Sequence, residues 1–153
     1  MSVHKPKTIY SFSGDHRFLS NFHPCLIYYD GVAYPCVEHA YQAAKTEDPK
    51  ERETILLAFT PGQAKSLGRM VKLRADWSEI KLSVMEFLIQ QKFQEPTLRA
   101  RLLATGDAEL VEGNTWNDYY WGKCRGQGAN HLGRIIMKVR DELRTYGTIV
   151  TRE

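Results

Sequence analysis

The sequence predicts a predominantly helical α+β protein in a single compact domain. Asp30-Gly31 joins two β-forming segments, Leu26–Tyr29 and Val32–Tyr34, and this arrangement is the strongest short-range signal for a hairpin. Downstream of the hairpin, helix-start signals recur along the rest of the chain. The length of 153 residues is typical of one domain and is sufficient to bury a hydrophobic core, so we assign residues 1–153 to one domain.

The residues ahead of the hairpin predict one strand and one turn. Thr8–Phe12 alternates apolar and polar side chains as a strand does, and Ser13–His16 has the composition of a turn. The next segment, Phe18–Phe22, places Ser20 and Asn21 between apolar anchors. We therefore expect a small β element near the N-terminus, before the helices begin.

The segment Tyr34–Lys45 predicts the opening turns of a helix. Pro35 suits the first helical position, where its missing N–H is not needed, and alanines and straight side chains extend the helix. Glu38 precedes Tyr41 and Gln42 by three and four residues, so the three side chains share one helix face. Such a carboxylate is either a buried, hydrogen-bonded acid or an ordinary solvated residue.

Further helices are predicted from their start signals. They are Pro49–Ala58, a helix capped by Thr60 that runs to about Arg69, a helix capped by Asp76 that runs to about Phe93, and a helix from Pro96 to Leu103 that stops at Gly106. Ala108–Val111 predicts a short strand. The last amphipathic helix carries its apolar residues on or near one face: Leu132, Ile135, Ile136, Val139 and Leu143. Gly128-Ala129-Asn130 leads into it, which predicts an anion site at its N-terminus.

The composition argues against several classes of protein. The formal charge of +3 suits a protein that handles anionic small molecules and is too small to indicate a nucleic-acid binder. The longest apolar runs are too short to span a bilayer, and the first residues lack the apolar core of a signal peptide. Three cysteines without C-x-x-C spacing favour free thiols in a reducing compartment. We expect a cytoplasmic protein without a membrane partner, with a loose tail at residues 148–153.

Carboxylates and aromatic residues are the chemical groups that stand out. They are Glu38, Glu112 and Asp118, with Tyr41, Trp77, Trp116 and Trp121. Aromatic faces can hold a flat base, and a carboxylate can stabilise an oxocarbenium-like sugar, which are the needs of glycoside cleavage. The alternative is an aromatic core with a charged rim. The basic segment Arg69–Arg74 is either a phosphate site or a solvated edge.

Three other groups are given no catalytic role. The histidines and cysteines show no metal-ligand spacing, so no metal site is predicted. His39 points some way from Glu38, as adjacent helical residues do, and is expected to be structural. Cys36 lacks an activating partner in the sequence.

Several motifs together resemble the YbiA-like (NADAR) family over about residues 9 to 144. In chain order they are Phe18-Leu19-Ser20-Asn21-Phe22-His23-Pro24, Tyr34-Pro35-Cys36-Val37-Glu38-His39-Ala40-Tyr41-Gln42-Ala43-Ala44-Lys45, Leu73-Arg74-Ala75-Asp76-Trp77, Met85 with Lys92-Phe93, Leu110-Val111-Glu112, Trp121-Gly122 and Asn130-His131-Leu132-Gly133. The second run is highly specific. The resemblance implies a compact, mainly helical α+β fold and an N-glycosidase that needs no metal or cofactor.

The resemblance also implies a substrate class and a set of site residues. Family members hydrolyse the N-glycosidic bond of phosphorylated ribosylamino-pyrimidine intermediates of riboflavin synthesis, and related members act on NAD- and ADP-ribose-linked substrates, including ADP-ribosylated guanine in a nucleotide or nucleic acid. Glu38 is the implied catalytic residue and Asp118 the second carboxylate, with Glu112 as the alternative. The implied substrate-binding residues are Ser20, Asn21, Tyr41, Arg74, Trp77, Trp121 and Asn130.

Two other functions stay open at this point. One is a sensor that binds ADP-ribose or NAD without cleaving it, against which the presence of Glu38 and Asp118 argues, because a binder needs no carboxylate at the anomeric carbon. The other is a nucleic-acid-associated domain, against which the small net charge argues.

Overall fold

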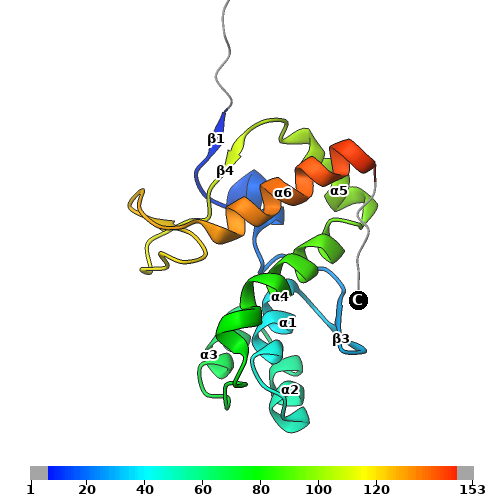
Figure 1. Cartoon of the computed structure of the whole chain (residues 1–153), viewed down its shortest axis with the longest axis vertical. Coiled ribbons are helices and arrows are strands. Elements are labelled where there is room, and N and C mark those ends of the chain that lie inside the picture. The colour runs from blue at the N-terminus through cyan, green and yellow to red at the C-terminus, as the bar shows by residue number, and fades with distance from the viewer. Residues whose placement is uncertain (1–6, 148–153) are drawn as a thin grey trace, which may run out of the picture. The chain divides into compact units, whose positions relative to one another are not determined.

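The computed structural model of the protein describes residues 7–147. Helices dominate this part of the chain and the strands are short, which confirms the predicted class of predominantly helical α+β protein (Figure 1). The chain contacts divide it into two units, residues 21–92 and residues 7–20 with 93–147, which are described separately. The predicted tail at 148–153 lies outside the described residues, and the assignment of 1–153 to one domain stays a prediction.

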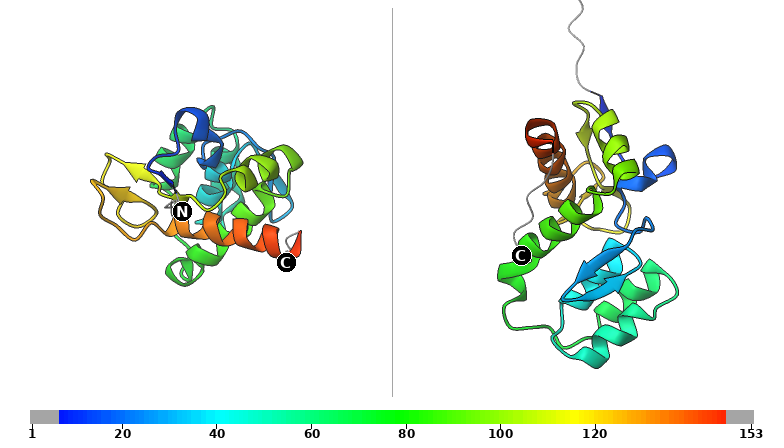
Figure 2. Two further views of the ribbon diagram at one scale, coloured as in Figure 1. Left: turned by 90° about the horizontal axis from the view of Figure 1, so that it is seen from above. Right: turned by 90° about the vertical axis from the view of Figure 1, so that its right-hand side faces the viewer.

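The unit of residues 21–92 begins with the predicted hairpin. Strands β2 (Ile27–Tyr29) and β3 (Val32–Tyr34) pair antiparallel, with Ile27 opposite Tyr34. Asp30 and Gly31 both have positive φ angles, 47° and 79°, which a two-residue type I′ turn requires. Figure 2 shows the hairpin beside α1, with which its strands are in contact.

Four helices follow the hairpin and pack around the first of them. They are α1 (Val37–Ala44), α2 (Pro49–Leu56), α3 (Pro61–Gly68) and α4 (Trp77–Lys92). Every residue of α1 is buried, and α1 contacts each of the other three helices. Because α1 is surrounded in this way, its polar side chains lie in a packed interior and need partners there.

The predicted start of α1 is wrong by two residues. The helix begins at Val37, and its N-cap is Cys36, whose backbone is extended. Pro35 therefore precedes the cap and does not occupy the first helical position. Its carbonyl accepts a hydrogen bond of 3.0 Å from the backbone N–H of Cys25, which continues the pairing of the hairpin past β3. The backbone pairing of the hairpin delays the start of the helix.

The caps of α2 and α3 follow the sequence signals. Asp48 accepts a hydrogen bond from the Lys50 N–H at 2.9 Å, ahead of α2. The Thr60 hydroxyl accepts one from the Gln63 N–H at 3.0 Å, which confirms the predicted cap of α3. Helix α4 begins at Trp77, directly after Asp76 as predicted.

The second unit, residues 7–20 with 93–147, combines short strand pairs with two helices. Its elements are β1 (Thr8–Ile9), the 3-10 helix η1 (Gly14–Leu19), α5 (Pro96–Ala104), β4 (Glu109–Leu110), β5 (Gly113–Asn114), β6 (Lys123–Cys124) and α6 (His131–Tyr146). Strands β1 and β4 pair in parallel, as do β5 and β6. The first strand is shorter than predicted, and the predicted turn at 13–16 is the start of η1.

Helix α6 buries the face that its spacing predicts. Leu132, Ile136, Val139 and Leu143 are buried, whereas Ile135 is only partly buried. The helix contacts α5 and β4. Its close approach to β4 requires Gly133, because a Cβ atom there would lie 2.1 Å from the Leu110 carbonyl oxygen.

Candidate functional site

Glu38 is a buried carboxylate on α1. The residue is 7% exposed. Its Oε1 atom accepts a 2.8 Å hydrogen bond from Nε2 of Gln42, which lies one turn further along the helix. The structure thus brings together two of the three side chains predicted to share a face, and gives Glu38 a defined orientation.

Tyr41 lies on α1 three residues after Glu38, and its ring pairs with that of Trp77 on α4. The centroids of Tyr41 and Trp77 are 5.2 Å apart with a 54° angle between the ring planes, and both residues are buried. The Nζ atom of Lys45 lies 5.4 Å from the Tyr41 centroid, in a cation–π contact. Helices α1 and α4 therefore place one aromatic pair and one cation on the side of α1 that carries Glu38.

Asn21 lies at the start of α1 with a buried acceptor. Its backbone carbonyl accepts the N–H of Glu38 at 3.1 Å, and its Nδ2 contacts the sulfur of Met85 at 3.6 Å. Its Oδ1 is buried and has no hydrogen-bond partner in the described part of the chain. A buried oxygen without a partner is unfavourable, and a substrate hydroxyl or N–H can satisfy it.

Arg74, predicted to bind substrate, is held by two carboxylates. Its Nε lies 2.7 Å from Asp76 Oδ1 and its Nη2 lies 3.3 Å from Glu47 Oε1. The hydrogen bond to Asp76 raises the pKa of the Arg74 guanidinium, with burial acting against it. The backbone N–H of Arg74 is also bound, to the Lys45 carbonyl at 2.8 Å. Arg74 thus anchors the segment that leads into α4, and a phosphate contact by it stays a prediction.

Cys36 and His39 form a buried pair beside the carboxylate. The Cys36 sulfur lies 3.1 Å from His39 Nδ1, and His39 Nε2 lies 3.1 Å from the Ala58 carbonyl oxygen. Because a carbonyl can only accept, Nε2 carries the proton and Nδ1 accepts from the thiol. Burial raises the pKa of the Cys36 thiol to about 11. This arrangement fits the structural role predicted for His39.

In the other unit, Asp118 and Trp121 lie in a loop pinned by Asn114. The Asn114 side chain accepts from the Asp118 N–H at 3.0 Å and donates to the carbonyls of Asp118 and Lys123. Oδ1 of Asp118 accepts the backbone N–H groups of Tyr120 at 3.2 Å and Trp121 at 2.9 Å. One oxygen of Asp118 thus shapes the loop, and its catalytic role stays a prediction, as does substrate binding by Trp121.

Asn130 has a structural role in the second unit. Its Oδ1 accepts the Glu112 N–H at 3.0 Å and its Nδ2 donates to the Leu110 carbonyl at 2.9 Å, so its side chain joins α6 to the strand segment. Its left-handed φ of 54° also suits asparagine. Substrate binding by Asn130 stays a prediction. Ser20, the residue that follows η1, is partly buried, and its predicted contact with substrate is likewise untested.

The predicted anion site at the N-terminus of α6 is wrong. The backbone N–H groups of residues 129–132 each donate to a carbonyl oxygen of the 119–122 loop, at distances from 2.8 to 3.2 Å. An anion site at a helix end needs N–H groups that point to the ligand. Here the tertiary fold of the loop satisfies them, which the sequence spacing did not reveal.

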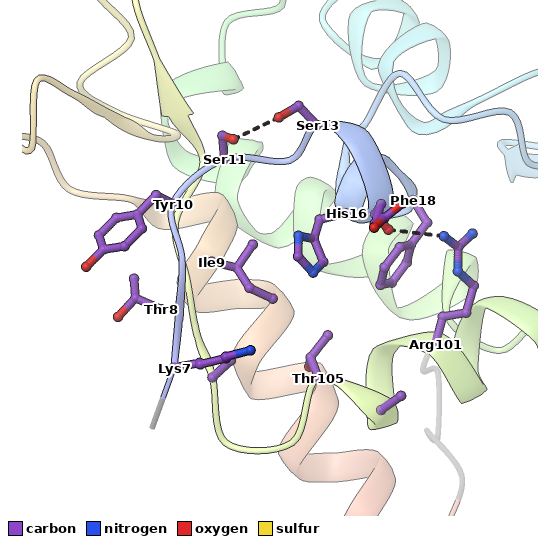
Figure 3. Close-up of a pocket in the computed structure, with 13 residues that line it drawn as sticks. Lys7, Thr8, Ile9, Tyr10, Ser11, Ser13, His16, Phe18, Arg101 and Thr105 are labelled. Atoms are coloured by element: carbon purple, nitrogen blue, oxygen red, sulfur yellow. Dashed lines mark hydrogen bonds between the residues drawn. The ribbon is translucent and has the colours of Figure 1, made fainter. Parts of the chain in front are cut away.

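A cavity of about 770 Å³ lies elsewhere in this unit, beside β1 and η1 (Figure 3). His16, Ile9 and Thr105 line it, and Arg101 stands at its edge with its guanidinium 4.2 Å from the Phe18 ring centroid. Arg101 also donates to the Asp15 carbonyl. None of the residues predicted to act on substrate lines this cavity.

The described residues offer neither a metal-binding cluster nor a membrane-spanning helix. Residues 7–147 contain no group of three or more His, Cys, Asp or Glu side chains that could hold a metal ion. Within the same range, no helix has the length and apolar character needed to cross a membrane. The three cysteines are all free thiols.

The hydrogen bond between Gln42 and Glu38 agrees with the buried, hydrogen-bonded alternative that the sequence leaves open for this carboxylate. Sequence reasoning missed Lys45, to which it assigns no role. Lys45 ends the specific run from Tyr34 and stands four residues after Tyr41, so a signal for it was present. The fold and this site define an α+β protein that places a buried carboxylate, an amide and two aromatic rings around one helix.

This chain belongs to the NADAR domain family, whose model matches residues 6–144. It is 43% identical over 138 residues to the N-glycosidase YbiA of Escherichia coli, covering 88% of this chain and 86% of that protein. It is 41% identical over 148 residues to a riboflavin biosynthesis protein of Vibrio vulnificus, of which it spans 40% of the length. The NMR structure of E. coli YbiA matches with a TM-score of 0.82 at 38% identity, covering 99% of this chain and 93% of that one.

Proposed function

We propose that this protein is an N-glycosidase that hydrolyses the N-glycosidic bond of a phosphorylated ribosyl substrate. The observation that carries the proposal is Glu38, a carboxylate 7% exposed that is held by the amide of Gln42. Membership of the NADAR family and the N-glycosidase name of its E. coli relative support the reaction class. The substrate candidates are a ribosylamino-pyrimidine phosphate and ADP-ribose attached to guanine.

The proposed mechanism assigns Glu38 to the developing charge. As the bond between the anomeric carbon and the base nitrogen breaks, the electron pair leaves with the base and positive charge develops on the sugar. The Glu38 carboxylate stabilises that charge and takes a proton from the water whose oxygen adds to the anomeric carbon, while the departing nitrogen gains a proton from solvent. Trp77 and Tyr41 offer aromatic faces to the flat base, and Asn21 offers its buried Oδ1 to a hydroxyl or N–H of the substrate.

Asp118 and Trp121 belong to the other unit, and a catalytic role for Asp118 and base binding by Trp121 stay predictions from the family resemblance. Ser20, Arg74 and Asn130 stay predicted substrate contacts, and the side chains of Arg74 and Asn130 also bind protein groups. The predicted cytoplasmic location belongs to the proposal as well, and the three free cysteines agree with it.

A panel of substrates tests the proposal. The protein is incubated with a ribosylamino-pyrimidine phosphate, ADP-ribosylated guanosine and NAD, and the free base is measured by chromatography. Release from at least one substrate by the native protein, and its loss in Glu38→Gln, is the expected result. A carboxylate that stabilises transition-state charge contributes on the order of 3 kcal/mol or more, about a hundredfold in rate.

Two results would contradict the proposal. Near-native turnover by Glu38→Gln would remove that residue from the mechanism. Tight binding without release from any of the three substrates would instead favour a sensor of ADP-ribose or NAD. Binding of the intact substrate by Glu38→Gln serves as the control that the variant is folded.

A further inference from the structure

The cavity beside β1 and η1 is lined by basic side chains from three segments of the chain. Lys7 precedes β1, His16 belongs to η1 and Arg101 belongs to α5. Figure 3 shows His16 between Lys7 and Arg101 in this view of the cavity. None of the three forms an ion pair with a carboxylate of residues 7–147. The proposed mechanism uses none of these basic groups.

Arg101 is held in place without a carboxylate. Its guanidinium carbon lies 4.2 Å from the centroid of the Phe18 ring, and its Nη2 donates to the Asp15 carbonyl oxygen at 3.2 Å. Because Phe18 is buried, the ring against which the guanidinium stacks belongs to the core. A guanidinium has five N–H donors, so one hydrogen bond leaves others for a ligand. A cation that is already positioned loses little further freedom when it binds an anion.

A buried arginine lies behind one wall of the same cavity. Arg140 on α6 is 4% exposed, and its Nη1 donates at 2.9 Å to the hydroxyl of Thr105, which lines the cavity. Its Nε is buried and has no hydrogen-bond partner in the described part of the chain. Asp107 and Asp141 are bound by Arg144, at 2.8 Å and 3.7 Å. The charge of Arg140 therefore lies close behind the lining, where the protein interior screens it less than water does.

The rest of the lining combines apolar groups with hydroxyl groups. Asp15 is the one acid among the described residues that line the cavity, and it is exposed. The hydroxyls of Ser11 and Ser13 are hydrogen-bonded to each other at 2.8 Å. The apolar lining residues are Ile9, Phe18, Ala104 and Ala108.

The size of the cavity indicates an organic ligand. Its volume of about 770 Å³ falls within the range of small-molecule sites, which is about 300–1,000 Å³. An inorganic anion alone would leave most of this space and all of the apolar lining uncovered. A ligand with both an anionic group and a carbon skeleton matches the two parts of the lining.

We propose that this cavity binds a small organic phosphate. Arg101, His16 and Lys7 bind or attract the phosphate group, and the carbon skeleton covers the apolar part of the lining. A phosphate monoester carries about two negative charges at neutral pH, which suits a cavity where basic groups outnumber the single acid. Arginine in particular can bind a phosphate through two parallel N–H donors. The proposal does not rest on the N-glycosidase function, because none of these residues takes part in that mechanism.

NMR titration of the full, ¹⁵N-labelled chain with four small molecules tests the proposal. Phenyl phosphate has both a phosphate and an apolar ring. Phenol lacks the phosphate, inorganic phosphate lacks the ring, and benzoate has a carboxylate in place of the phosphate. We expect phenyl phosphate to cause saturable shifts of amides in residues 7–18 and 101–108, which contain the lining, and to bind more tightly than the other three.

Two variants and a matched control test the assigned side chains. We expect Arg101→Gln to bind phenyl phosphate about tenfold more weakly, because it loses a charge-assisted hydrogen bond, and Lys7→Gln to weaken binding as well. The control is Arg17→Gln, which removes the same charge from an exposed position on η1 outside the lining and should bind as the native protein does. Lys7 and Arg101 are exposed, and circular dichroism checks that both variants are folded.

Several results would overturn the proposal. One is an absence of shifts in residues 7–18 and 101–108, even where phenyl phosphate shifts residues 21–92. Native affinity in both Lys7→Gln and Arg101→Gln is another, as is an equal loss in Arg17→Gln, which would show only an effect of net charge. Benzoate binding as tightly as phenyl phosphate would refute the choice of phosphate, and equally tight inorganic phosphate would refute the apolar contact.

Release of free base by the same preparations separates this proposal from the proposed function. If phenyl phosphate binds at the cavity but no substrate releases its base, the cavity site stands and the N-glycosidase does not. If base is released but phenyl phosphate causes no shifts at the cavity, the enzyme stands and the cavity site is refuted.

Discussion

Replacing Gly68 by alanine should disconnect Glu38 from its amide partner. Helix α3 packs against α1 at this position, and an added Cβ would lie 1.9 Å from Oε1, 2.7 Å from Cδ and 3.0 Å from Cβ of Gln42. All three distances are shorter than or at the lower limit of ordinary contact. The Gln42 amide must therefore move, and that amide donates the 2.8 Å hydrogen bond to Glu38.

The expected magnitude has two parts. Overpacking of a well-packed interior lowers the free energy of unfolding by about 1–3 kcal/mol. Loss of a hydrogen bond to a charged group adds about 1.5–3 kcal/mol where the carboxylate cannot find another donor. If that second amount acts on the transition state, turnover falls by about ten- to a hundredfold. Substrate affinity should change less, because the rings of Tyr41 and Trp77 that are proposed to bind the base are untouched.

Urea unfolding followed by tryptophan fluorescence measures the first effect, and release of free base measures the second. The matched control is Gly62→Ala on the same helix, where an added Cβ meets only the Thr60 hydroxyl at 3.9 Å. We expect this control to be neutral or slightly stabilising, since alanine favours helices more than glycine does.

A second substitution separates packing from positioning. Gly68→Ala combined with Gln42→Ala removes the contacts with Oε1 and Cδ and leaves the 3.0 Å contact with Cβ, so stability should recover in part relative to Gly68→Ala alone while turnover stays low. Native stability and native turnover in Gly68→Ala would refute the reasoning, because they would show that Gln42 does not need its observed position. Recovery of turnover in the double variant would show that the amide is not needed to hold Glu38.

Three further predictions concern other parts of the molecule. The Cys36 thiol is buried and its pKa is raised to about 11, so at pH 8 it should react with iodoacetamide only when the protein is unfolded. Mass spectrometry of the modified peptide measures this reaction. Rapid labelling of the folded protein would contradict the burial of the thiol. Burial lowers the pKa of Lys45 below its usual 10.5, so between the lowered and the usual pKa the unfolded chain binds more protons than the folded protein. The free energy of unfolding therefore rises with pH in that range. Urea unfolding of Lys45→Met at several pH values should show a smaller rise, and the same dependence of the unfolding free energy on pH as in the native protein would contradict this. The Asn114 side chain binds backbone groups of Asp118 and Lys123, so Asn114→Ala should lower the free energy of unfolding by about 1–3 kcal/mol. The 114–123 loop of this variant should also be cut faster in limited proteolysis. An unchanged digestion pattern would contradict this role of Asn114.

The sequence correctly predicted the turns and helix caps that depend on residues close together in the chain. The Asp30-Gly31 turn needs two positive φ angles, and the chain supplies residues that accept them. The Thr60 cap of α3 depends on a hydrogen bond to an N–H three residues away. The start of α1 was placed at Pro35 in error, because the pairing of Cys25 with the Pro35 carbonyl connects residues ten positions apart.

The candidate site was predictable in its residue types and less so in its contacts. The spacing of Glu38 and Gln42 is local and implied one face, which the hydrogen bond between them agrees with. The contact of Arg74 with Glu47 and the closed N-terminus of α6 depend on how distant segments fold back, and only the second contradicts a prediction from the sequence.

The sequence by itself determined the class of fold, the family and the position of the carboxylate on its helix, because turns, caps and helix faces depend on residues within about four positions of one another. Only the tertiary structure decided which charges are already paired. The packing of α3 and α4 against α1 brings Gly68 to Gln42 and Trp77 to Tyr41. The residues in these contacts are too far apart in the sequence for a local pattern to reveal them. The energies of the contacts depend on burial, which exists only after folding.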